Sequence, residues 1–396
     1  MKIAPLQALF FVCVTDVLGF GIMVPLVPYM AERYGATPTQ LTLLVGVYSV
    51  CQLVASPLLG RLSDRIGRRP VLLISMGFNG LSYLMLGFGS NLWWILASRM
   101  LGGLMAGNIA TAFAYASDIS TPANRARSLG VVGAAIALGF LLGPPLGGLL
   151  AGEDVAQASF LRPSLFAAVV ALLAMALVWF VMPESHGPAQ RGAQPHEAAI
   201  PAHPFQLLRT LPALRALVIA TVFVTTAQST FESIYALWAL NHFHVGPRTT
   251  GLTMLALAGM ALLSQGYLVR RLVPRFGEYR LIYTAIGCFA AGFLVLASGL
   301  SLPLTVAGLA LLGLGVGLYN PNGSSLASHQ ALAGNRGAVM GVYAAGTSLA
   351  RVIGPLCSGY LYSRLGTAMP FIFGAFIALQ AAWAIAASRR AAGAAA

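Results

Sequence analysis

Charged residues are scarce in this sequence. Only 8% of its 396 residues are Asp, Glu, Lys or Arg, and only 10 of these are acidic. A soluble globular protein carries about 25% charged and about 45–50% apolar residues. Here 58% of the residues are hydrophobic. The composition therefore excludes an ordinary soluble domain and favours a protein embedded in a lipid bilayer.

Cysteine is also rare, and the usual catalytic and metal-binding clusters are missing. The four cysteines lie within apolar runs and form neither a disulfide framework nor a metal-ligand pattern, at Cys13, Cys51, Cys288 and Cys357. We expect them to act as small buried hydrophobes. Without a phosphate-binding loop or a nucleophile–base set, the sequence argues against an enzyme, and no metal or organic cofactor is expected.

What the sequence does contain is a series of long apolar runs. A membrane-spanning helix needs about 20 predominantly apolar residues. Twelve runs meet this need, at residues 6–30, 40–60, 70–89, 92–114, 126–151, 161–182, 214–241, 249–272, 279–299, 303–326, 337–362 and 369–388. The predicted fold class is an all-α integral membrane protein with twelve transmembrane helices.

The proline-rich segment between the sixth and seventh runs separates two halves of the chain. It holds six prolines together with Gly, His and Arg, which is typical of a linker. We predict an N-terminal six-helix bundle at residues 1–182, a cytoplasmic linker at 183–213 and a C-terminal six-helix bundle at 214–396.

The basic residues fix the expected orientation. With both termini in the cytoplasm, 17 Lys and Arg residues fall on the inner side and 4 on the outer side. This bias follows the positive-inside rule of a multi-pass protein, here of a bacterial inner membrane. The net charge of +13 is therefore attributed to orientation in the bilayer, and no nucleic-acid partner is expected.

The two halves also repeat each other. Asn124-Arg125 and the glycine-proline run at 143–148 recur 211 residues later, as Asn335-Arg336 and the run at 354–359. Arg65-Ile66-Gly67-Arg68 recurs in degraded form 210 residues later, as Arg275-Phe276-Gly277-Glu278. Two parallel copies of a six-helix unit are typical of a transporter built from related halves.

The most densely charged stretch is Gly60–Arg69, which carries four arginines between two apolar runs. We interpret it as a cytoplasmic loop in which Gly60 and Gly67 permit close approach and a tight reversal. Asp64 can accept charge-assisted hydrogen bonds from the arginines. The pattern suggests a loop that locks and unlocks; the alternative is a basic loop that only orients the protein.

Four motifs make the chain resemble a major facilitator superfamily transporter over essentially its whole length. Gly60–Arg69 resembles the loop 2–3 signature, and residues 99–103 the fourth-helix signature, with Gly102 in place of the usual glutamine. Residues 139–148 resemble the antiporter motif of the fifth helix. Residues 16–28 resemble the first helix of tetracycline/proton antiporters. The resemblance implies two bundles around a central cavity and a monomer as the default state.

Asp16 lies about ten residues into the first run, near the middle of the bilayer. A carboxylate there is costly, so a functional role is the default expectation, and apolar surroundings favour its protonated form. The long side chain of Arg99, in the fourth run, is expected to reach the same depth. We predict a proton-sensitive interaction of Asp16 with Arg99, direct or through a water; a permanent structural ion pair is the alternative.

A second pair is predicted in the other half. Glu232 is the only acid of the seventh run and Arg351 the only internal base of the eleventh. Because the repeats should make these runs neighbours, we expect the two side chains to pair. Glu232 is then either part of a structural pair or a second site for a proton or a cationic substrate.

The resemblance further implies an inner gate and a kinked small-residue face. The gate would join Asp64, Arg65 and Arg68 to Asp118, and ordinary interfacial charge is the alternative. Gly143 and Pro144 lie in the small-residue face of the fifth run, which either limits leakage or simply allows helix packing.

A polar interruption in the tenth run is expected to line a cavity. It joins a larger set of candidate substrate-binding residues, each of which is equally explained by hydrogen bonding between helices: Asn108, Gln228, Tyr235, Trp238, Gln265, Tyr319, Asn320 and Asn322.

The predicted function is proton-coupled efflux of a small, amphipathic, drug-like compound by alternating access. The proton gradient would be its energy source, and the protein would contribute to antibiotic resistance. The alternatives are a transporter of one endogenous metabolite, such as a siderophore, a lipid-like molecule or a sugar, and a transport-inactive sensor or scaffold.

Overall fold

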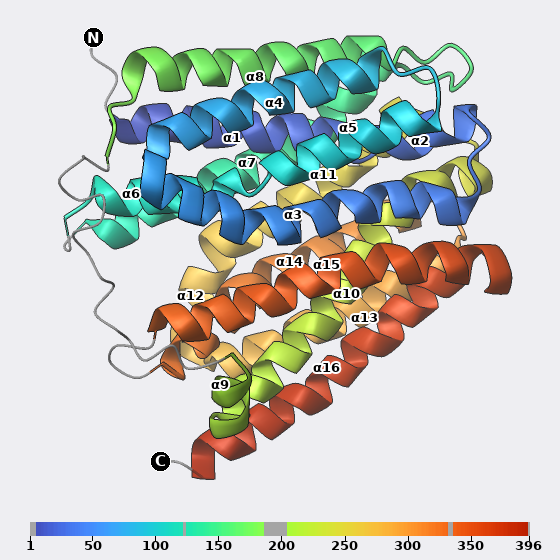
Figure 1. Cartoon of the computed structure of the whole chain (residues 1–396). Helices are drawn as coiled ribbons and strands as arrows, with labels where there is room; N and C mark the ends of the chain where they lie inside the picture. Colours follow the sequence, from blue (N-terminus) through green and yellow to red (C-terminus); the bar gives the residue numbers. More distant parts are fainter. Residues whose placement is uncertain (1–4, 122–123, 186–203, 332–335, 395–396) are drawn as a thin grey trace. The chain divides into compact units, whose positions relative to one another are not determined.

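The computed structural model describes residues 5–121, 124–185, 204–331 and 336–394, and within these ranges the chain is helical with no strand. Figure 1 shows the helices in sequence order. Their bounds are α1 Pro5–Met23, α2 Leu26–Arg33, α3 Pro38–Ile66, α4 Arg68–Gly87, α5 Leu92–Met105, α6 Asn108–Asp118, α7 Arg125–Ala151, α8 Leu161–Val181, α9 Pro204–Thr210, α10 Pro212–Phe243, α11 Pro247–Leu263, a π-helix Ser264–Leu268, α12 Val269–Phe276, α13 Glu278–Ser298, α14 Leu302–His329, α15 Arg336–Leu365 and α16 Met369–Ala394.

The described residues contain 11 helical segments that are long and apolar enough to cross a membrane. Each of these segments coincides with one of the twelve predicted runs. The first segment, Pro5–Arg33, contains both α1 and α2. The fourth run is the exception, because it is divided into α5 and α6, which are 14 and 11 residues long. Counting this pair as one interrupted span gives the twelve-span fold that the sequence predicts.

The fourth span packs closely against α3 around its interruption. A Cβ at Gly103 would lie 2.4 Å from the carbonyl oxygen of Tyr48, and one at Gly107 would lie 2.9 Å from the Cα of Ser56. The two glycines therefore bring α5 and α6 against the backbone of α3. Gln52 of α3 donates from Nε2 to the carbonyl oxygen of Ala106 (3.3 Å), which satisfies an acceptor at the break.

Helix ends follow local capping chemistry. Thr37 and Gln40 form a reciprocal capping box at the start of α3. The Asn91 side chain accepts from the Trp94 N–H at 3.0 Å and caps α5. A larger difference from the sequence prediction lies at Gly60–Arg69, where the expected loop is wrong. Helix α3 continues to Ile66, and the reversal takes place at Gly67 alone, with φ of +108°.

The chain forms two compact units. Unit 1 comprises residues 1–195 and 239–255, and unit 2 comprises residues 196–238 and 256–396. Within unit 1, α1 packs against α7 and α8, and α4 packs against α5 and α8. Within unit 2, α13 packs against α14 and α16. The division into bundles at the 183–213 linker stays a prediction.

The small-residue face of α7 lies directly against α1. A Cβ at Gly139 would lie 2.8 Å from the Cβ of Val17, and one at Gly143 would lie 2.7 Å from the Cα of Gly21. Gly143 and Pro144 thus belong to a helix contact that admits no larger side chain at the glycine. The predicted close packing is present; a role in limiting leakage remains a prediction.

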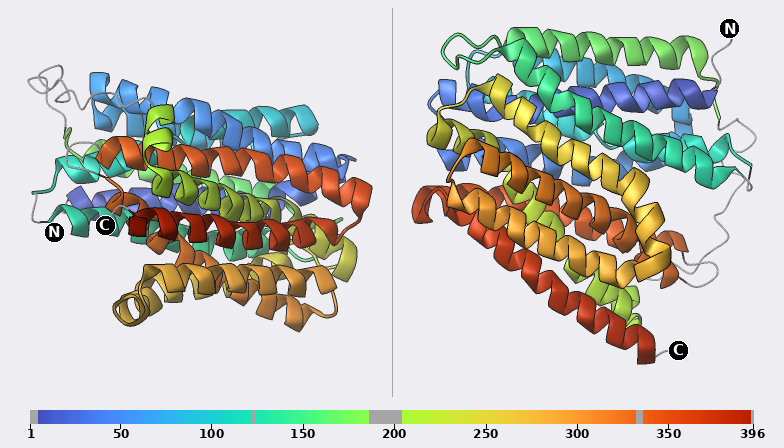
Figure 2. Two further views of the ribbon diagram at one scale, coloured as in Figure 1. Left: turned by 90° about the horizontal axis from the view of Figure 1, so that it is seen from below. Right: turned by 180° about the vertical axis from the view of Figure 1, so that it is seen from behind.

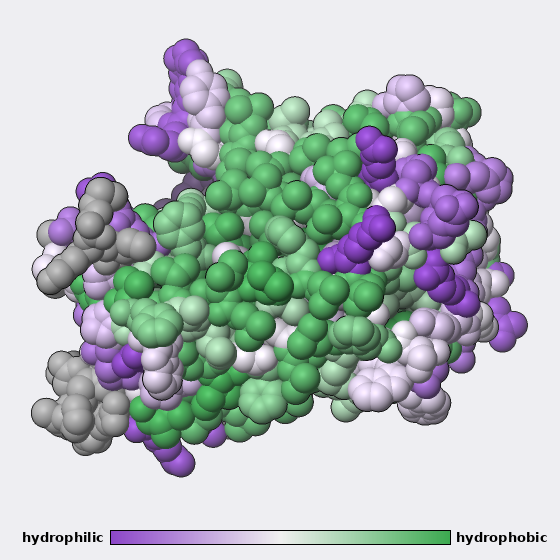
Figure 3. All heavy atoms as spheres, turned by 90° about the horizontal axis from the view of Figure 1, so that it is seen from above, coloured by the Kyte–Doolittle hydropathy of each residue, from purple (hydrophilic) through white to green (hydrophobic). Residues whose placement is uncertain are grey.

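The surface shown in Figure 3 carries a broad apolar band, with hydrophilic residues gathered towards its ends. Helix α8 illustrates how much apolar surface is exposed, since Phe180 is 82% and Leu173 58% exposed. An apolar surface of this extent suits lipid rather than water. Cys13 is buried and the other three cysteines are half-buried, all of them as free thiols.

Candidate functional site

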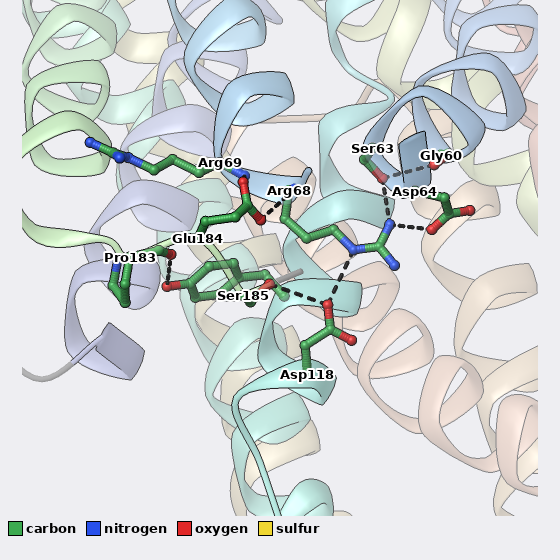
Figure 4. Close-up of polar contacts among 10 residues, drawn as sticks. Gly60, Ser63, Asp64, Arg68, Arg69, Asp118, Pro183, Glu184 and Ser185 are labelled. Carbon is green, nitrogen blue, oxygen red and sulfur yellow. Dashed lines mark hydrogen bonds and ion pairs between the residues drawn. The ribbon is translucent and has the colours of Figure 1, made fainter. Parts of the chain in front are cut away.

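The junction between α3 and α4 carries a charge cluster centred on Arg68 (Figure 4). Arg68 Nη1 lies 2.6 Å from Asp64 Oδ1, and its Nε lies 3.2 Å from Asp118 Oδ2 at the end of α6. Nη1 also donates to the hydroxyl of Ser63. The Arg68 side chain is only 11% exposed, whereas that of Asp64 is 60% exposed. Asp118 is therefore its more shielded partner.

Two of the predicted gating residues stand apart from this cluster. Arg65 is exposed, and it makes no ion pair with any residue that the structure describes. Its helical position turns it away, because α3 continues through this point instead of forming a loop. A Cβ placed on Gly60 would have no other atom within 4 Å, so no close approach requires a glycine there. The carbonyl oxygen of Gly60 accepts a hydrogen bond from the Ser63 hydroxyl at 2.8 Å.

The sequence prediction missed a carboxylate that completes the cluster. Helix α4 begins with Arg68 and Arg69, two cations at the positive end of the helix dipole. The carboxylate of Glu184, just after α8, accepts from the backbone N–H of Arg68 at 2.9 Å and of Arg69 at 3.2 Å. It thus caps α4 from the first residues of the linker. The sequence signal for this cap is Glu184 itself, an acid that directly follows the sixth apolar run on the side of the membrane where the arginines gather.

Neighbouring residues fasten the same segment to α6. The Tyr115 hydroxyl donates to the carbonyl oxygen of Pro183 at 2.9 Å, and the Ser185 hydroxyl donates to Asp118 Oδ2 at 3.2 Å. Asp118 therefore accepts from both Arg68 and Ser185 (Figure 4). The start of the linker, the end of α6 and the α3–α4 junction form one connected polar network.

A second polar group lies along α1, but the expected partner of Asp16 is different. The amide of Asn79 on α4 donates to Asp16 Oδ1 at 2.9 Å, and no ion pair joins Asp16 to Arg99 among the described residues. Arg99 is 5% exposed and lies over the ring of Tyr48, 4.4 Å from its centroid. Aromatic faces stabilise a guanidinium that has no acid beside it. A direct Asp16–Arg99 pair is therefore wrong for this structure.

A small cavity adjoins Asp16. It has a volume of about 10 Å³ and is lined by Asp16 and Asn108 together with apolar side chains. Asn108 is 1% exposed, and its amide lies beside the Asp16 carboxylate. A cavity of about this size admits one water. The polar lining would give such a water partners on both sides.

The pair predicted in the second half is present. Arg351 Nη1 lies 3.5 Å from Glu232 Oε2, and both side chains are partly exposed. The amide of Gln228 donates to the other carboxylate oxygen at 2.8 Å. Helices α10 and α15 are neighbours here, because the Ser229 hydroxyl donates to the carbonyl oxygen of Ala350 at 3.1 Å.

The predicted substrate-binding residues divide into two groups. Tyr235 and Trp238 are 1% exposed, and Trp238 packs edge-on against Phe371 of α16 with ring centroids 5.0 Å apart. Their rings form part of the core of unit 2. Contact of these two side chains with a ligand stays a prediction, and in this structure both rings are packed within unit 2. Gln228 and Gln265 remain partly exposed.

The polar stretch of α14 is likewise more structural than expected. Tyr319 is 1% exposed, and its hydroxyl hydrogen-bonds to Thr221 at 3.1 Å. Asn322 is 2% exposed and donates to the carbonyl oxygen of Leu318 at 2.7 Å. Helix α14 runs unbroken through Pro321, so the predicted interruption is wrong. Of the predicted residues of this stretch, only Asn320 is exposed.

The α12–α13 junction of unit 2 holds a charge pair that the sequence prediction missed. Glu278 begins α13, and its carboxylate lies 3.6 Å from His329 Nδ1 at the end of α14. It also accepts from the hydroxyl of Ser325 at 2.5 Å. The Glu278 side chain is 18% exposed and that of His329 is 63% exposed. The repeat offset offered a signal, since Glu278 and His329 follow Arg68 and Asp118 by 210 and 211 residues.

Known proteins resemble this chain over nearly its full length. It is 29% identical over 366 residues to multidrug resistance protein 2 of Bacillus subtilis, covering 91% of this chain and 89% of that protein. It is also 29% identical to the class C tetracycline resistance protein of Escherichia coli, covering 88% and 87% of the two chains.

Solved structures share the fold. The crystal structure of the human organic anion transporter MFSD10 superposes with a TM-score of 0.72 at 24% identity, covering 96% of this chain and 98% of that one. The crystal structure of the nucleoside transporter NupG gives a TM-score of 0.78 at 12% identity, covering 98% and 99%. The sequence model of the Major Facilitator Superfamily matches residues 9–331 and 217–394. The chain therefore belongs to the Major Facilitator Superfamily.

Proposed function

We propose that this protein exports small, amphipathic, drug-like compounds across the bacterial inner membrane in exchange for protons. The observation that carries the proposal is the placement of Asp16, a lone carboxylate in the membrane-spanning part of α1, held by Asn79 beside a small, mostly apolar cavity that Asn108 also lines. An acid at this depth is costly and is kept where it moves protons or binds a cation. Relatives named for multidrug and tetracycline resistance support a drug-like substrate.

In this mechanism Asp16 alternates between its charged and protonated forms. The charged form accepts from the Asn79 amide, and the protonated form would instead donate to a water in the cavity shared with Asn108. Arg99 is held over the ring of Tyr48 in this structure and is not assigned a step in the proton transfer. One proton moving inward contributes ~2.3 kcal/mol per 100 mV of membrane potential.

The Arg68 cluster would serve as the cytoplasmic gate, with both termini on that side. Its contacts tie α3, α4, α6 and the start of the linker together. We propose that these contacts hold one of the two alternating states and break in the other. The Glu232–Arg351 pair would be a second coupling site or a structural tie, and the Glu232→Gln variant separates these roles.

The test is substrate-driven proton movement in proteoliposomes. Purified full-length protein is reconstituted with an internal pH dye and challenged with cationic dyes and tetracycline-like compounds, with the Asp16→Asn and Glu232→Gln variants beside it. We expect compound-dependent proton movement in the wild type and its loss in Asp16→Asn. Compound transport without a proton signal would indicate a uniporter, and an unaffected Asp16→Asn variant would exclude Asp16 as the coupling acid.

A further inference from the structure

Helix α12 is a short basic segment with two distinct faces. An α-helix turns by about 100° per residue. On this helix the apolar side chains fall within an arc of about 100°, namely Val269, Leu272, Val273 and Phe276. The arginines lie on the opposite side, namely Arg270, Arg271 and Arg275. None of its residues is buried. A helix with basic residues on one face and apolar residues on the other is suited to the surface of an anionic membrane.

The π-helix before α12 changes the direction of the chain. Ser264 begins this segment and lies close to α14. A Cβ placed on Gly317 of α14 would be 2.4 Å from the Cβ of Ser264. Its hydroxyl donates to the carbonyl oxygen of Met260 at 2.7 Å. An inserted π-turn bends a helix at such a contact. In Figure 2, α12 leaves the line of the preceding helix.

The length of the segment allows α12 to lie at the edge of the bilayer. Pro247–Phe276 comprises 30 residues, which correspond to about 45 Å of helix. The hydrocarbon core is about 30 Å thick. The segment is therefore longer than the core, and its most basic part, α12, is the part best suited to the level of the lipid headgroups.

The arginines of this region lack acidic partners. The nearby acid, Glu278, is engaged with Ser325 and His329. Arg270, Arg275 and Arg280 are exposed, and none forms an ion pair with a residue in the described ranges. The equivalent junction of unit 1 differs, because Asp64 and Asp118 pair with Arg68 there and Glu184 caps its helix. Exposed arginines without an acidic partner in the described ranges therefore occur at both junctions, Arg65 in unit 1 and a larger group in unit 2.

Two aromatic residues border the arginines on the same segment. The guanidinium of Arg271 donates to the hydroxyl of Tyr267 and lies 5.8 Å from the centroid of its ring. Tyr267 is 52% exposed and Phe276 is 50% exposed. Aromatic side chains prefer the boundary between headgroups and acyl chains. Guanidinium groups match phosphate oxygens with paired hydrogen bonds.

We propose that α12 and Arg280 form a binding site for the phosphate headgroup of anionic phospholipids, in the leaflet on the side of the chain termini. The arginines hold the phosphate, and Tyr267 and Phe276 contact the upper acyl chains. The π-helix sets the angle at which α12 meets the headgroup layer. The site is separate from the proposed proton site and gate, so it stands or fails independently of them.

The experiment compares lipid retention by full-length variants. Protein is exchanged between detergent and vesicles of phosphatidylethanolamine with or without phosphatidylglycerol, and bound lipids are counted by native mass spectrometry. We expect the wild type to retain phosphatidylglycerol selectively. The double variant R270Q/R275Q should bind it roughly 10- to 30-fold more weakly, because each arginine near an anionic surface contributes about a fivefold factor.

The matched control is R389Q/R390Q, which removes two exposed arginines from the end of α16 on the same side. Because these arginines lie outside the proposed site, this variant should lose less phosphatidylglycerol than R270Q/R275Q. Equal losses in both double variants would show a diffuse charge effect and overturn the site. Full retention by R270Q/R275Q would overturn it as well. Inorganic phosphate should not displace the lipid, and displacement would point to a free-anion site instead.

Discussion

The α3–α4 and α12–α13 junctions occupy equivalent places in the two sequence repeats, but the second helix of each junction begins with a residue of opposite charge. In unit 1 a cation at the start of α4, Arg68, meets an acid at the end of α6, Asp118. In unit 2 an acid at the start of α13, Glu278, meets a histidine at the end of α14, His329. The contact between these two positions is kept in both repeats although its polarity is reversed.

The helix dipole explains why only one junction recruits a third segment. Negative charge at a helix start is favourable and positive charge is not. Glu278 supplies the negative charge at the start of α13 itself. Helix α4 starts with two arginines, and Glu184 supplies the missing charge from beyond α8. Reversing the polarity of one pair therefore ties the linker to the junction in unit 1 only.

The largest expected effect comes from removing the cation of unit 1. Arg68→Ala leaves Asp118 without its partner at a shielded position, so we expect efflux rates to fall roughly tenfold or more. Arg68→Glu should be worse, because it places three carboxylates around the same point. The double variant R68E/D118H copies the polarity of unit 2 and should recover part of the loss. Initial rates of dye efflux from proteoliposomes measure all three, and wild-type rates in Arg68→Ala would make the contact dispensable.

A smaller effect is expected from the cap that distinguishes the junctions. Glu184→Ala should cost about 1 kcal/mol of stability at the start of α4, because two backbone N–H groups lose their acceptor. Hydrogen exchange of the Arg68 and Arg69 amides should accelerate about fivefold, with other amides of α4 unchanged. Glu184→Gln keeps an acceptor and should lie between the two. Unchanged exchange at both amides would remove Glu184 from the network.

The contact of unit 2 is expected to matter less than that of unit 1. The Glu278 carboxylate lies 3.6 Å from His329 Nδ1, and the His329 side chain is 63% exposed. Because a partly exposed pair is a weak one, we expect His329→Ala to lower the initial rate of dye efflux from proteoliposomes by no more than about two- to fivefold.

A second variant of His329 sharpens this comparison. His329→Arg places a permanent cation beside Glu278 and should transport at about the wild-type rate. A loss in His329→Ala as large as that in Arg68→Ala would make the two contacts equally important.

The smallest effect is expected at Asp64. Its side chain is 60% exposed, and exposed ion pairs contribute about 1 kcal/mol or less. Asp64→Asn should lower the thermal unfolding temperature only slightly and remain close to the wild type in transport. A loss as large as that of Arg68→Ala would rank Asp64 with Asp118, contrary to its exposure.

Much of this fold is readable from sequence, because hydrophobic runs of spanning length dictate helices in a bilayer. The break between α5 and α6 is not, and neither is the close approach of Gly103 and Gly107 to α3, because no hydrophobic run marks either of them. The same limit applies to Trp238. A sequence shows that an aromatic lies in a helix, but only packing against Phe371 shows which face it occupies.

Polar partners are the least predictable part. Asp16 and Arg99 stand out because charge is rare in the spans, whereas Asn79, the residue that bonds to Asp16, resembles any polar residue between helices. Glu184 was hidden for another reason. Its role follows from the arginines that begin α4, and the sequence prediction had assigned those arginines to a loop.

The single-residue reversal at Gly67 has a consequence for how this chain tolerates change. Loops between helices are usually the places where insertions are accepted. Here one glycine with φ of +108° separates α3 from α4. Arg68, which follows it, contacts Asp64 at the end of α3 and Asp118 at the end of α6. One added residue would rotate the start of α4 by about 100° and separate Arg68 from Asp118. The most hydrophilic turn of the molecule is thus a place where length cannot vary.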